Sequence, residues 1–328
     1  MVRSLLDTVL DRTVVVGYTS LGYRLRSSGW NPQEVQPMDG KVVLVTGATS
    51  GLGLAAAEGF ARLSASVWLI ARDQQRGERA RAQVARNARG GEVQVGHCDL
   101  GDLASVRKFA EGFCGQTARL DVLVNNAGAL VNQRKRSADG IELTFATNVV
   151  GPFLLTKLLV PELGRSAPSR IINVSSGGMY AQKLRVDDLQ SEHGDFDGAA
   201  VYARSKRAEV VLTELWAKRL RGQGIVVHSM HPGWADTPGV KSSLPRFYKL
   251  TKPLLRSPAQ GADTIVWLGA APQAAQSSGE FWHDRRARPT HLLPGTRESA
   301  EDRQRLWDEC ERLSGDHGNQ PSGQSRSA

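Results

Sequence analysis

The sequence contains little cysteine and few aromatic residues. Its 3 cysteines in 328 residues, Cys98, Cys114 and Cys310, are widely spaced and none belongs to a CxxC pair. This pattern argues against a disulfide framework and a cysteine-rich metal site, so we expect free thiols in a reducing compartment. Aromatic residues make up 6% of the chain, whereas Ala, Val, Leu and Gly are frequent. Such a composition is typical of a helix-covered parallel sheet rather than an all-β sandwich.

The chain also has no long apolar run at its start. Residues 13–16 are largely apolar, but Asp7, Arg12 and Arg24 lie around them. The run falls short of the roughly 20 apolar residues that span a bilayer, and Asp7 and Asp11 would interrupt a signal peptide. We therefore expect an intracellular, cytoplasmic protein.

The first residues leave one alternative open. An amphipathic helix there could lie on a membrane, or its apolar face could dock on the rest of the protein. We favour docking, because two aspartates lie on the same short segment. The apolar residues concerned are Leu5, Leu6, Val9, Leu10 and those at 14–16.

Basic residues outnumber acidic ones, with 42 Lys and Arg against 33 Asp and Glu and a formal charge of +9. This excess suits nucleic acid, anionic lipid or a phosphorylated cofactor. The sequence has no nucleic-acid recognition motif and no platform of interleaved aromatic and basic residues, so we expect no nucleic-acid binding. Residues 72–89 hold six arginines and two acidic residues.

Short β-branched apolar runs alternate with helical segments along the chain. We expect strands at 41–46, 67–71, 93–98, 120–124, 170–174 and 225–230. This alternation predicts an α/β fold, a Rossmann-type doubly wound parallel sheet in a single domain. We assign residues 1–38 to an N-terminal extension, 39–295 to the catalytic domain, and 296–328 to a C-terminal helix and a tail disordered from Ser314 onward.

A glycine-rich turn follows the first strand directly. The segment reads Thr46, Gly47, Ala48, Thr49, Ser50, Gly51, Leu52, Gly53. Glycines there let backbone N–H groups approach an anionic ligand at a helix N-terminus without a Cβ in the way. Between the first strand and the first helix, the segment predicts dinucleotide binding.

The TGxxxGxG spacing resembles the cofactor loop of the short-chain dehydrogenase/reductase superfamily, whose other motifs follow in order over about residues 40–290. These motifs are the stretch from Asn125 through Asn126 and Ala127 to Gly128, then Asn148, Ser175 with Ser176, Tyr202 with Lys206 (YxxxK), Pro232 with Gly233, and Thr237. Residues 175–179, 188–192 and 230–239 narrow the resemblance to one branch of the superfamily. Residues 182–198 form an insertion, similar to that of retinol-dehydrogenase-like members, that we expect near the mouth of the site and that hints at an apolar substrate.

Tyr202 and Lys206 would share one face of a helix, because they are four residues apart. An ammonium beside a phenol lowers the pKa of the phenol from its usual value near 10, which prepares it for proton transfer. The resemblance implies that Tyr202 exchanges a proton with the substrate oxygen and that Lys206 also binds the nicotinamide ribose. It further implies that Ser176, or Ser175 as the alternative, binds that oxygen and that Asn148 holds a relay water.

The resemblance also assigns a cofactor site. Asp99 and Leu100 after the third strand resemble the adenine-contacting pair, although Asp99 could equally be a helix N-cap. Arg72, at the end of the second strand and one turn before Arg76, could pair with a 2′-phosphate, so we favour NADP(H) over NAD(H). Asp73 could instead reach a 2′-hydroxyl. The remaining expected contacts are Thr46, Gly47, Ser50, Gly51, Leu52, Gly53, Asn126, Ala127, Gly128, Tyr202, Lys206, Pro232, Gly233 and Thr237.

Other candidate residues have simpler interpretations. We interpret the acidic insertion as a solvated loop rather than a metal site, and expect no metal. We interpret His97, His228 and His231 as structural rather than catalytic. Trp234, Thr237 and Phe247 belong where the family has a substrate lid, which Pro232, Pro238, Pro245 and Pro253 would divide into short segments.

These features predict an NADP(H)-dependent oxidoreductase that interconverts a carbonyl and an alcohol on a small, apolar molecule. The alternative is a catalytically silent dinucleotide-binding sensor or scaffold. The resemblance implies a homo-oligomer formed through helix faces, although longer members of this branch can be monomeric. The sequence leaves the substrate and the direction of the reaction open.

Overall fold

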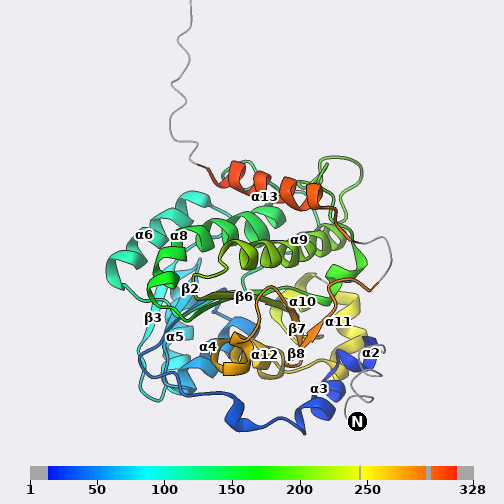
Figure 1. The fold of residues 1–328 in the computed structure, drawn as a ribbon. Helices are drawn as coiled ribbons and strands as arrows, with labels where there is room; N and C mark the ends of the chain where they lie inside the picture. Colours follow the sequence, from blue (N-terminus) through cyan, green and yellow to red (C-terminus); the bar gives the residue numbers. More distant parts are fainter. Residues whose placement is uncertain (1–13, 244, 293–296, 316–328) are drawn as a thin grey trace, which may run out of the picture.

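The fold is built on one eight-stranded sheet with the order β3-β2-β1-β4-β5-β6-β7-β8 (Figure 1). The computed structural model describes residues 14–243, 245–292 and 297–315. Strands β1 to β7 run parallel, and β8 pairs antiparallel with β7. The strands are β1 Val42–Thr46, β2 Ser66–Ala71, β3 Val93–His97, β4 Val122–Asn125, β5 Ser169–Val174, β6 Ile225–Met230, β7 Phe281–His283 and β8 Arg286–Arg288.

The six predicted strands are confirmed, with ends displaced by at most two residues, and the Rossmann-type sheet with them. Strands β7 and β8 were not predicted. Each has three residues and lacks a β-branched run. Their turn, Asp284-Arg285, adopts φ of 51° and 58° without the glycine or asparagine that usually marks such a hairpin.

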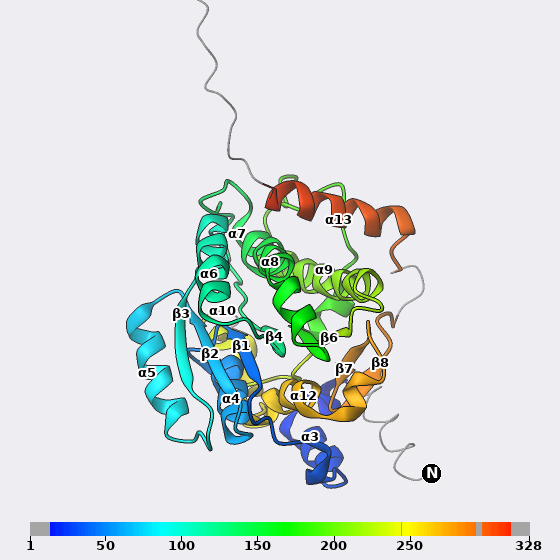
Figure 2. The same cartoon turned by 60° about the vertical axis from the view of Figure 1, so that its left-hand side comes forward.

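Helices cover both faces of the sheet (Figures 1 and 2). Alternate side chains of each strand enter opposite layers: Leu44 belongs to one apolar core, and Val43 and Val45 to the other. The first layer has α6 Leu103–Gln116, α8 Gly151–Arg165, α9 Gly198–Arg219 and α13 Ala300–Ser314. The second has α4 Gly51–Arg62, α5 Gln74–Ala85 and α12 Pro258–Ala270.

One long apolar helical stretch, Leu143–Arg165, comprises α7 Leu143–Phe145, the π-turn η2 Ala146–Val150 and α8. By length and composition it could cross a membrane, but 72% of its most apolar window is buried within the protein. Its apolar side chains belong to the core that the sheet shares with α9.

The C-terminal helix α13 lies across α8 and α9 at the top of Figure 1. Leu306, Trp307 and Leu313 are buried in the same core as those helices. The Arg219 guanidinium of α9 lies 3.6 Å from the centre of the Trp307 ring. The predicted disordered tail lies almost entirely outside the described residues.

The N-terminal extension docks on the domain from α2 Val14–Gly17 through α3 Ser20–Ser27 to the short 3-10 turn η1 Pro32–Glu34. Tyr18 and Thr19 are buried, whereas Leu21 and Leu25 are exposed. Among the described residues, Tyr18 makes the docking contact. The apolar face that we expected to dock lies almost entirely outside the described residues. Leu5, Leu6, Val9 and Leu10 lie outside the described residues.

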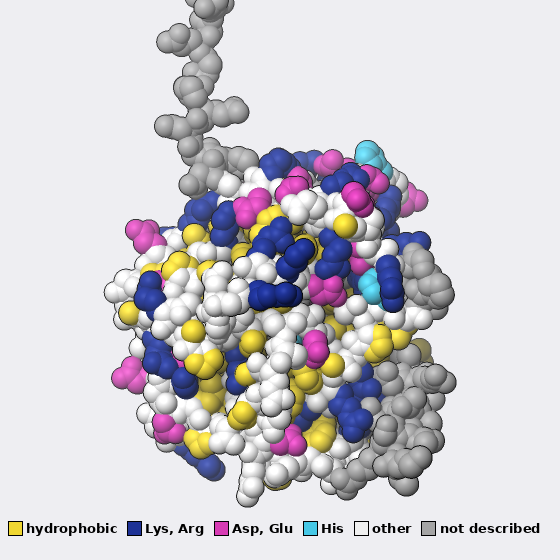
Figure 3. All heavy atoms as spheres, viewed as in Figure 1, with side chains coloured by type: hydrophobic (Ala, Val, Ile, Leu, Met, Phe, Trp, Pro, Cys, Tyr) yellow, Lys and Arg dark blue, Asp and Glu magenta, His cyan; other side chains and the backbone are white. Residues whose placement is uncertain are grey.

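Charged side chains of both signs are distributed over the face of the molecule shown in Figure 3, where Lys and Arg occur in several places among Asp and Glu. Within the arginine-rich helix α5, the Arg81 guanidinium pairs with the Glu78 carboxylate at 2.7 Å, and both side chains are about half exposed. Surface pairs of this kind add little stability.

Candidate active site

A cavity of about 580 Å³ opens at the carboxyl ends of the central strands. The first turn of α4, the loops after β4, β5 and β6, and one face of α9 line it, which is where open α/β sheets bind ligands. Its walls combine apolar side chains with a few polar groups. Of the predicted site residues, it brings together Leu52, Asn126, Gly128, Ser175, Ser176, Tyr202, Lys206, Pro232, Gly233 and Thr237.

The glycine loop is held in place by the loop after β4. The Thr46 hydroxyl accepts hydrogen bonds from the backbone N–H groups of Asn126 (2.9 Å) and Ala127 (3.0 Å). The Asn126 side-chain amide donates to the Thr46 carbonyl at 2.8 Å. A Cβ on Gly53 would lie 2.4 Å from that amide nitrogen and 2.5 Å from the Gly47 carbonyl oxygen. Only glycine fits at residue 53, because the two loops approach so closely there.

Helix α4 begins at Gly51, within the glycine-rich segment. Within the described part of the chain, the side chain of the N-cap residue Ser50 makes no capping hydrogen bond. The first N–H groups of α4 are therefore available to an anion such as a pyrophosphate. A Cβ on Gly51 would lie 3.3 Å from the Thr237 methyl group, which places Thr237 beside this helix N-terminus.

Tyr202 and Lys206 lie on α9 and both line the cavity. The Lys206 ammonium is 5.5 Å from the centre of the Tyr202 ring and donates a hydrogen bond of 2.9 Å to the Val174 carbonyl at the end of β5. Lys206 is buried, whereas Tyr202 is half-buried. The two side chains therefore lie close together on one face of α9.

The two adjacent serines differ in their hydrogen bonds. The Ser175 hydroxyl is buried and donates to the Lys206 carbonyl at 2.8 Å. The Ser176 hydroxyl accepts from the Gly178 N–H at 3.2 Å and is half-buried. The Ser176 hydroxyl therefore keeps its proton for a ligand. The Ser175 hydroxyl, by contrast, uses its proton in the bond to the Lys206 carbonyl.

Asn148 lies in the π-turn η2 rather than in a regular helix. Its Oδ1 accepts from the Ala129 N–H at 2.7 Å, and its Nδ2 donates to the Ala129 carbonyl at 3.0 Å and to the Ser205 hydroxyl at 2.9 Å. These bonds join the loop after β4 to α9. The amide thereby fixes one wall of the cavity.

The residues expected at the adenosine end lie around the ends of β2 and β3. Arg72 is exposed immediately after β2, and the Asp73 carboxylate caps α5 by accepting the Arg76 N–H at 2.8 Å. Asp99 accepts from the Gly101 N–H at 2.9 Å and Leu100 is buried. The alternative that Asp99 caps the next helix is wrong, because the N-cap of α6 is Asp102.

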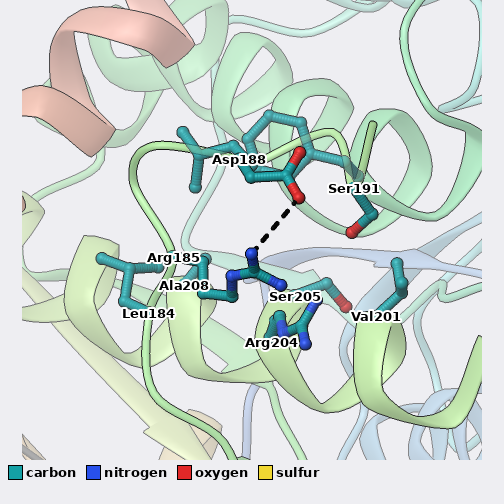
Figure 4. Close-up of a pocket in the computed structure, with 10 residues that line it drawn as sticks. Leu184, Arg185, Asp188, Ser191, Val201, Arg204, Ser205 and Ala208 are labelled. Carbon is teal, nitrogen blue, oxygen red and sulfur yellow. Dashed lines mark ion pairs between the residues drawn. The ribbon is translucent and has the colours of Figure 1, made fainter. Parts of the chain in front are cut away.

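The insertion only partly follows expectation. Gln182 and Asp197 line the cavity, but the Asp187 carboxylate pairs with Arg305 of α13 at 2.6 Å. The Asp188 side chain is buried, lies 3.7 Å from the Arg185 guanidinium and faces a small cavity beside α9 (Figure 4). The prediction of a solvated loop is therefore wrong for Asp188, whose contacts come from its own loop. Among the described residues, no cluster of metal-ligating side chains is found.

The histidines have structural contacts. His228 is buried and its Nε2 lies 2.9 Å from the Ala274 carbonyl oxygen, while the His231 ring stacks on His283 at 3.8 Å. Burial lowers the pKa of both His228 and His231. His97 is exposed, with its Nε2 3.1 Å from the Arg72 carbonyl oxygen.

Trp234 and Thr237 line the cavity, and the segment after them is divided as predicted. It forms α10 Pro238–Ser243, α11 Pro245–Thr251 and the 3-10 turn η4 Lys252–Leu254. The Phe247 side chain lies outside the described residues.

The sequence did not reveal how the N-terminal extension supports the cavity. The Tyr18 carbonyl accepts the Trp234 N–H at 2.8 Å and the Arg256 Nε–H at 3.0 Å. A Cβ on Gly177 would lie 2.6 Å from the Tyr18 ring. The loops that carry Gly177 and Trp234 therefore both pack on Tyr18, which lies 159 and 216 positions earlier in the sequence. No local pattern signals this contact.

Comparisons with known proteins agree with this geometry. The short chain dehydrogenase family model matches residues 41–246. Dehydrogenase/reductase SDR family member 12 of Bos taurus is 44% identical over 299 residues, covering 90% of this chain and 93% of that protein. Retinol dehydrogenase 12 of Homo sapiens is 36% identical over 279 residues, covering 84% and 87%.

Solved structures share the fold. A crystal structure of a protein from Mycobacterium paratuberculosis superposes with a TM-score of 0.69 at 27% identity, covering 87% of this chain and 97% of that one. The RhlG/NADP complex of Pseudomonas aeruginosa gives 0.63 at 26% identity, covering 77% and 96%. The resemblance of residues 175–179, 188–192 and 230–239 to one branch of the superfamily is also confirmed, by the 44% identity to dehydrogenase/reductase SDR family member 12. The chain belongs to the short-chain dehydrogenase/reductase family and is an NAD(P)-dependent oxidoreductase of carbonyl and alcohol groups.

Proposed function

We propose that the protein uses NADP(H) to interconvert an alcohol and a carbonyl on an apolar small molecule, with Tyr202 as the acid/base. The observation that carries this proposal is the position of Tyr202 and Lys206 on one face of α9, inside the cavity that the glycine loop borders. Bound nicotinamide would supply or accept the hydride. Tyr202 gives a proton to the substrate oxygen in reduction and takes it back in oxidation.

Neighbouring residues position the reacting groups. The Lys206 ammonium, 5.5 Å from the centre of the Tyr202 ring, is the residue expected to bind the ribose. The Ser176 hydroxyl, held by the Gly178 N–H, orients the substrate oxygen. Asn148 holds the loop that carries Gly128 and is the expected anchor of a relay water.

The glycine loop fits a dinucleotide. Its backbone approaches the loop after β4 without room for a Cβ at residue 53, and the N-terminus of α4 offers free N–H groups. The preference for NADP(H) rests on Arg72, which is exposed at the end of β2. Asp73, the carboxylate that would favour a ribose hydroxyl, already serves as the cap of α5.

The lining supports an apolar substrate. Leu130, Val174, Ala181 and Trp234 line the cavity together with the polar groups of α9. Several relatives are retinol dehydrogenases by name, so retinoids belong among the first substrates to test. A cytoplasmic location and self-association remain predictions from the sequence.

The test is turnover of all-trans-retinal, decanal and a steroid ketone by the purified protein with NADPH or NADH. We expect Tyr202→Phe to lower kcat about 10²–10⁴-fold, as for loss of a general acid. Tyr180→Phe is the control, since the Tyr180 hydroxyl donates to the Pro289 carbonyl outside the cavity. NADPH binding without turnover of any carbonyl would contradict the proposal and favour the silent sensor.

The cofactor preference has its own test. Arg72→Ala should raise KM for NADPH about tenfold or more, the size of a lost charge-assisted contact, while leaving KM for NADH nearly unchanged. Arg81→Ala on α5 is the matched control, because the Arg81 guanidinium pairs with Glu78 on the surface. Equal effects of Arg72→Ala on both cofactors would refute a 2′-phosphate contact.

A further inference from the structure

Glu209 is a buried carboxylic acid in contact with Lys206. The two residues lie three positions apart on α9, with only 8% and 3% of their surfaces exposed. Lys206 Nζ donates to Glu209 Oε1 at 2.7 Å as well as to the Val174 carbonyl. Glu209 Oε2 is buried and, within the part of the chain that the structure describes, has no hydrogen-bond partner. Burying a carboxyl with one oxygen unpaired costs free energy, which calls for an explanation.

The two groups affect one another's protonation. Burial raises the pKa of Glu209 to about 7, although the Lys206 ammonium acts in the opposite direction. For Lys206, burial lowers the pKa, but the Glu209 carboxylate and Tyr202 outweigh it and the net direction is upward. Lys206 therefore stays protonated beside a carboxyl that changes its charge near neutral pH.

Lys206 is the charged group that acts on Glu209 among the described residues. Ionisable side chains on the elements packed against α9 have other partners. Arg170 of β5 donates to the Leu268 and Ala271 carbonyls, His228 of β6 contacts the Ala274 carbonyl, Tyr180 of η3 Gly177–Ala181 donates to the Pro289 carbonyl, and Arg303 of α13 pairs with Glu214.

We propose that Glu209 is a positioning residue that anchors the Lys206 ammonium and sets the net charge facing Tyr202. This role rests on the acid/base function proposed for Tyr202. When Glu209 is ionised, its charge offsets that of Lys206 and the phenolate is favoured less. When Glu209 is protonated, or replaced by a neutral residue, the full positive charge of Lys206 acts on Tyr202.

The size of the effect follows from the helix. Glu209 lies seven positions after Tyr202, which corresponds to about 10 Å along α9. At that distance, with an effective dielectric constant of about 20, one unit charge shifts a pKa by about one unit. We therefore expect Glu209→Gln to move the acid limb of alcohol oxidation, where Tyr202 acts as the base, about one pH unit towards lower pH.

The experiment measures kcat/KM for oxidation of all-trans-retinol with NADP⁺ as a function of pH. Glu209→Gln keeps an acceptor for Nζ and removes the charge. Glu214→Gln is the matched control on the same helix, because the Glu214 carboxylate pairs with Arg303 and not with Lys206. An acid limb that stays in place in Glu209→Gln, or moves to higher pH, would overturn the proposal.

A second variant keeps the test decisive if Glu209→Gln does not fold. Glu209→Asp retains the charge and draws the carboxylate back from Nζ, so we expect an unchanged acid limb and a raised KM for NADP⁺. A shift of the acid limb to lower pH in Glu209→Asp would overturn the proposal. Tyr202→Phe distinguishes failure of the acid/base proposal from failure of the Glu209 proposal. If Tyr202→Phe retains activity, the acid/base role of Tyr202 is wrong. If Tyr202→Phe is inactive and the acid limb is the same in Glu209→Gln as in the unsubstituted protein, only the role of Glu209 is wrong.

Discussion

Replacing Arg256 with methionine should destabilise the protein more than any loss of a surface ion pair. Arg256 is 1% exposed and binds the Asp284 carboxylate through two hydrogen bonds of 2.6 and 2.9 Å. The same guanidinium donates to the Gly17 carbonyl at 2.8 Å and to the Tyr18 carbonyl at 3.0 Å. It therefore ties the N-terminal extension to the turn between β7 and β8.

The expected magnitude follows from what Arg256→Met leaves behind. A buried ion pair broken on one side costs about 3–5 kcal/mol, because the remaining charge stays buried without its partner. Arg26 still pairs with Asp284 at 2.8 Å, so we expect the lower end of that range, about 3 kcal/mol. The segment containing Gly17 and Tyr18 should also detach.

Urea unfolding at pH 7, monitored by tryptophan fluorescence, measures the loss of unfolding free energy. Limited trypsin digestion detects release of the N-terminal extension. Arg312→Met is the control: Arg312 makes an equally short contact with Glu309 at 2.7 Å, but 60% of its side chain is exposed. Its loss should cost less than about 1 kcal/mol. Adding Asp284→Asn to Arg256→Met should restore part of the stability. Equal losses for Arg256→Met and Arg312→Met would refute the reasoning.

Two further predictions follow from the glycine loop and from the buried histidines. Gly53→Ala should weaken NADPH binding at least about tenfold and cost about 1–3 kcal/mol, because the new Cβ would lie 2.4 Å from the Asn126 amide nitrogen; nicotinamide fluorescence titration measures the affinity. Gly112→Ala, with no atom within 4 Å of its Cβ, should leave NADPH binding unchanged, and equal affinity of the two variants would contradict the close approach. Burial lowers the pKa of His283 to about 4, although Asp284 opposes it, so the unfolded chain binds a proton below about pH 6.5 that the folded protein refuses. The free energy of unfolding should therefore decrease as the pH is lowered from about 6.5 to 4. His283→Gln should reduce this dependence on pH, measured by urea titrations at several pH values. The same dependence on pH in both proteins would argue against a neutral buried imidazole.

Much of the fold and of the site was predictable from local pattern. The apolar runs of β1, β2, β4, β5 and β6 are buried on both faces, so their apolar character persists along each strand, whereas the edge strand β3 is mostly half-buried. The glycine loop is short and contiguous. Tyr202 and Lys206 share a helix face by their spacing alone.

Tertiary structure decided what depends on distant neighbours. The hairpin of β7 and β8 forms because β6 offers an edge for β7 to pair with, not because its own residues demand strands. Asp73 caps α5, and Ser175 donates to the Lys206 carbonyl. The spacing of residues in the sequence did not predict either contact.

The sequence by itself determined the parallel sheet, the glycine loop and the helix that carries Tyr202 and Lys206, because each follows from a period or a spacing of a few residues. The tertiary structure decided the environment of that helix. It placed Glu209 in a closed interior with Lys206, where burial raises the pKa of its carboxyl. It also brought Arg256 to Gly17, 239 positions away, to hold the wall beside the cavity. Burial and contacts across such separations arise only when the whole chain packs.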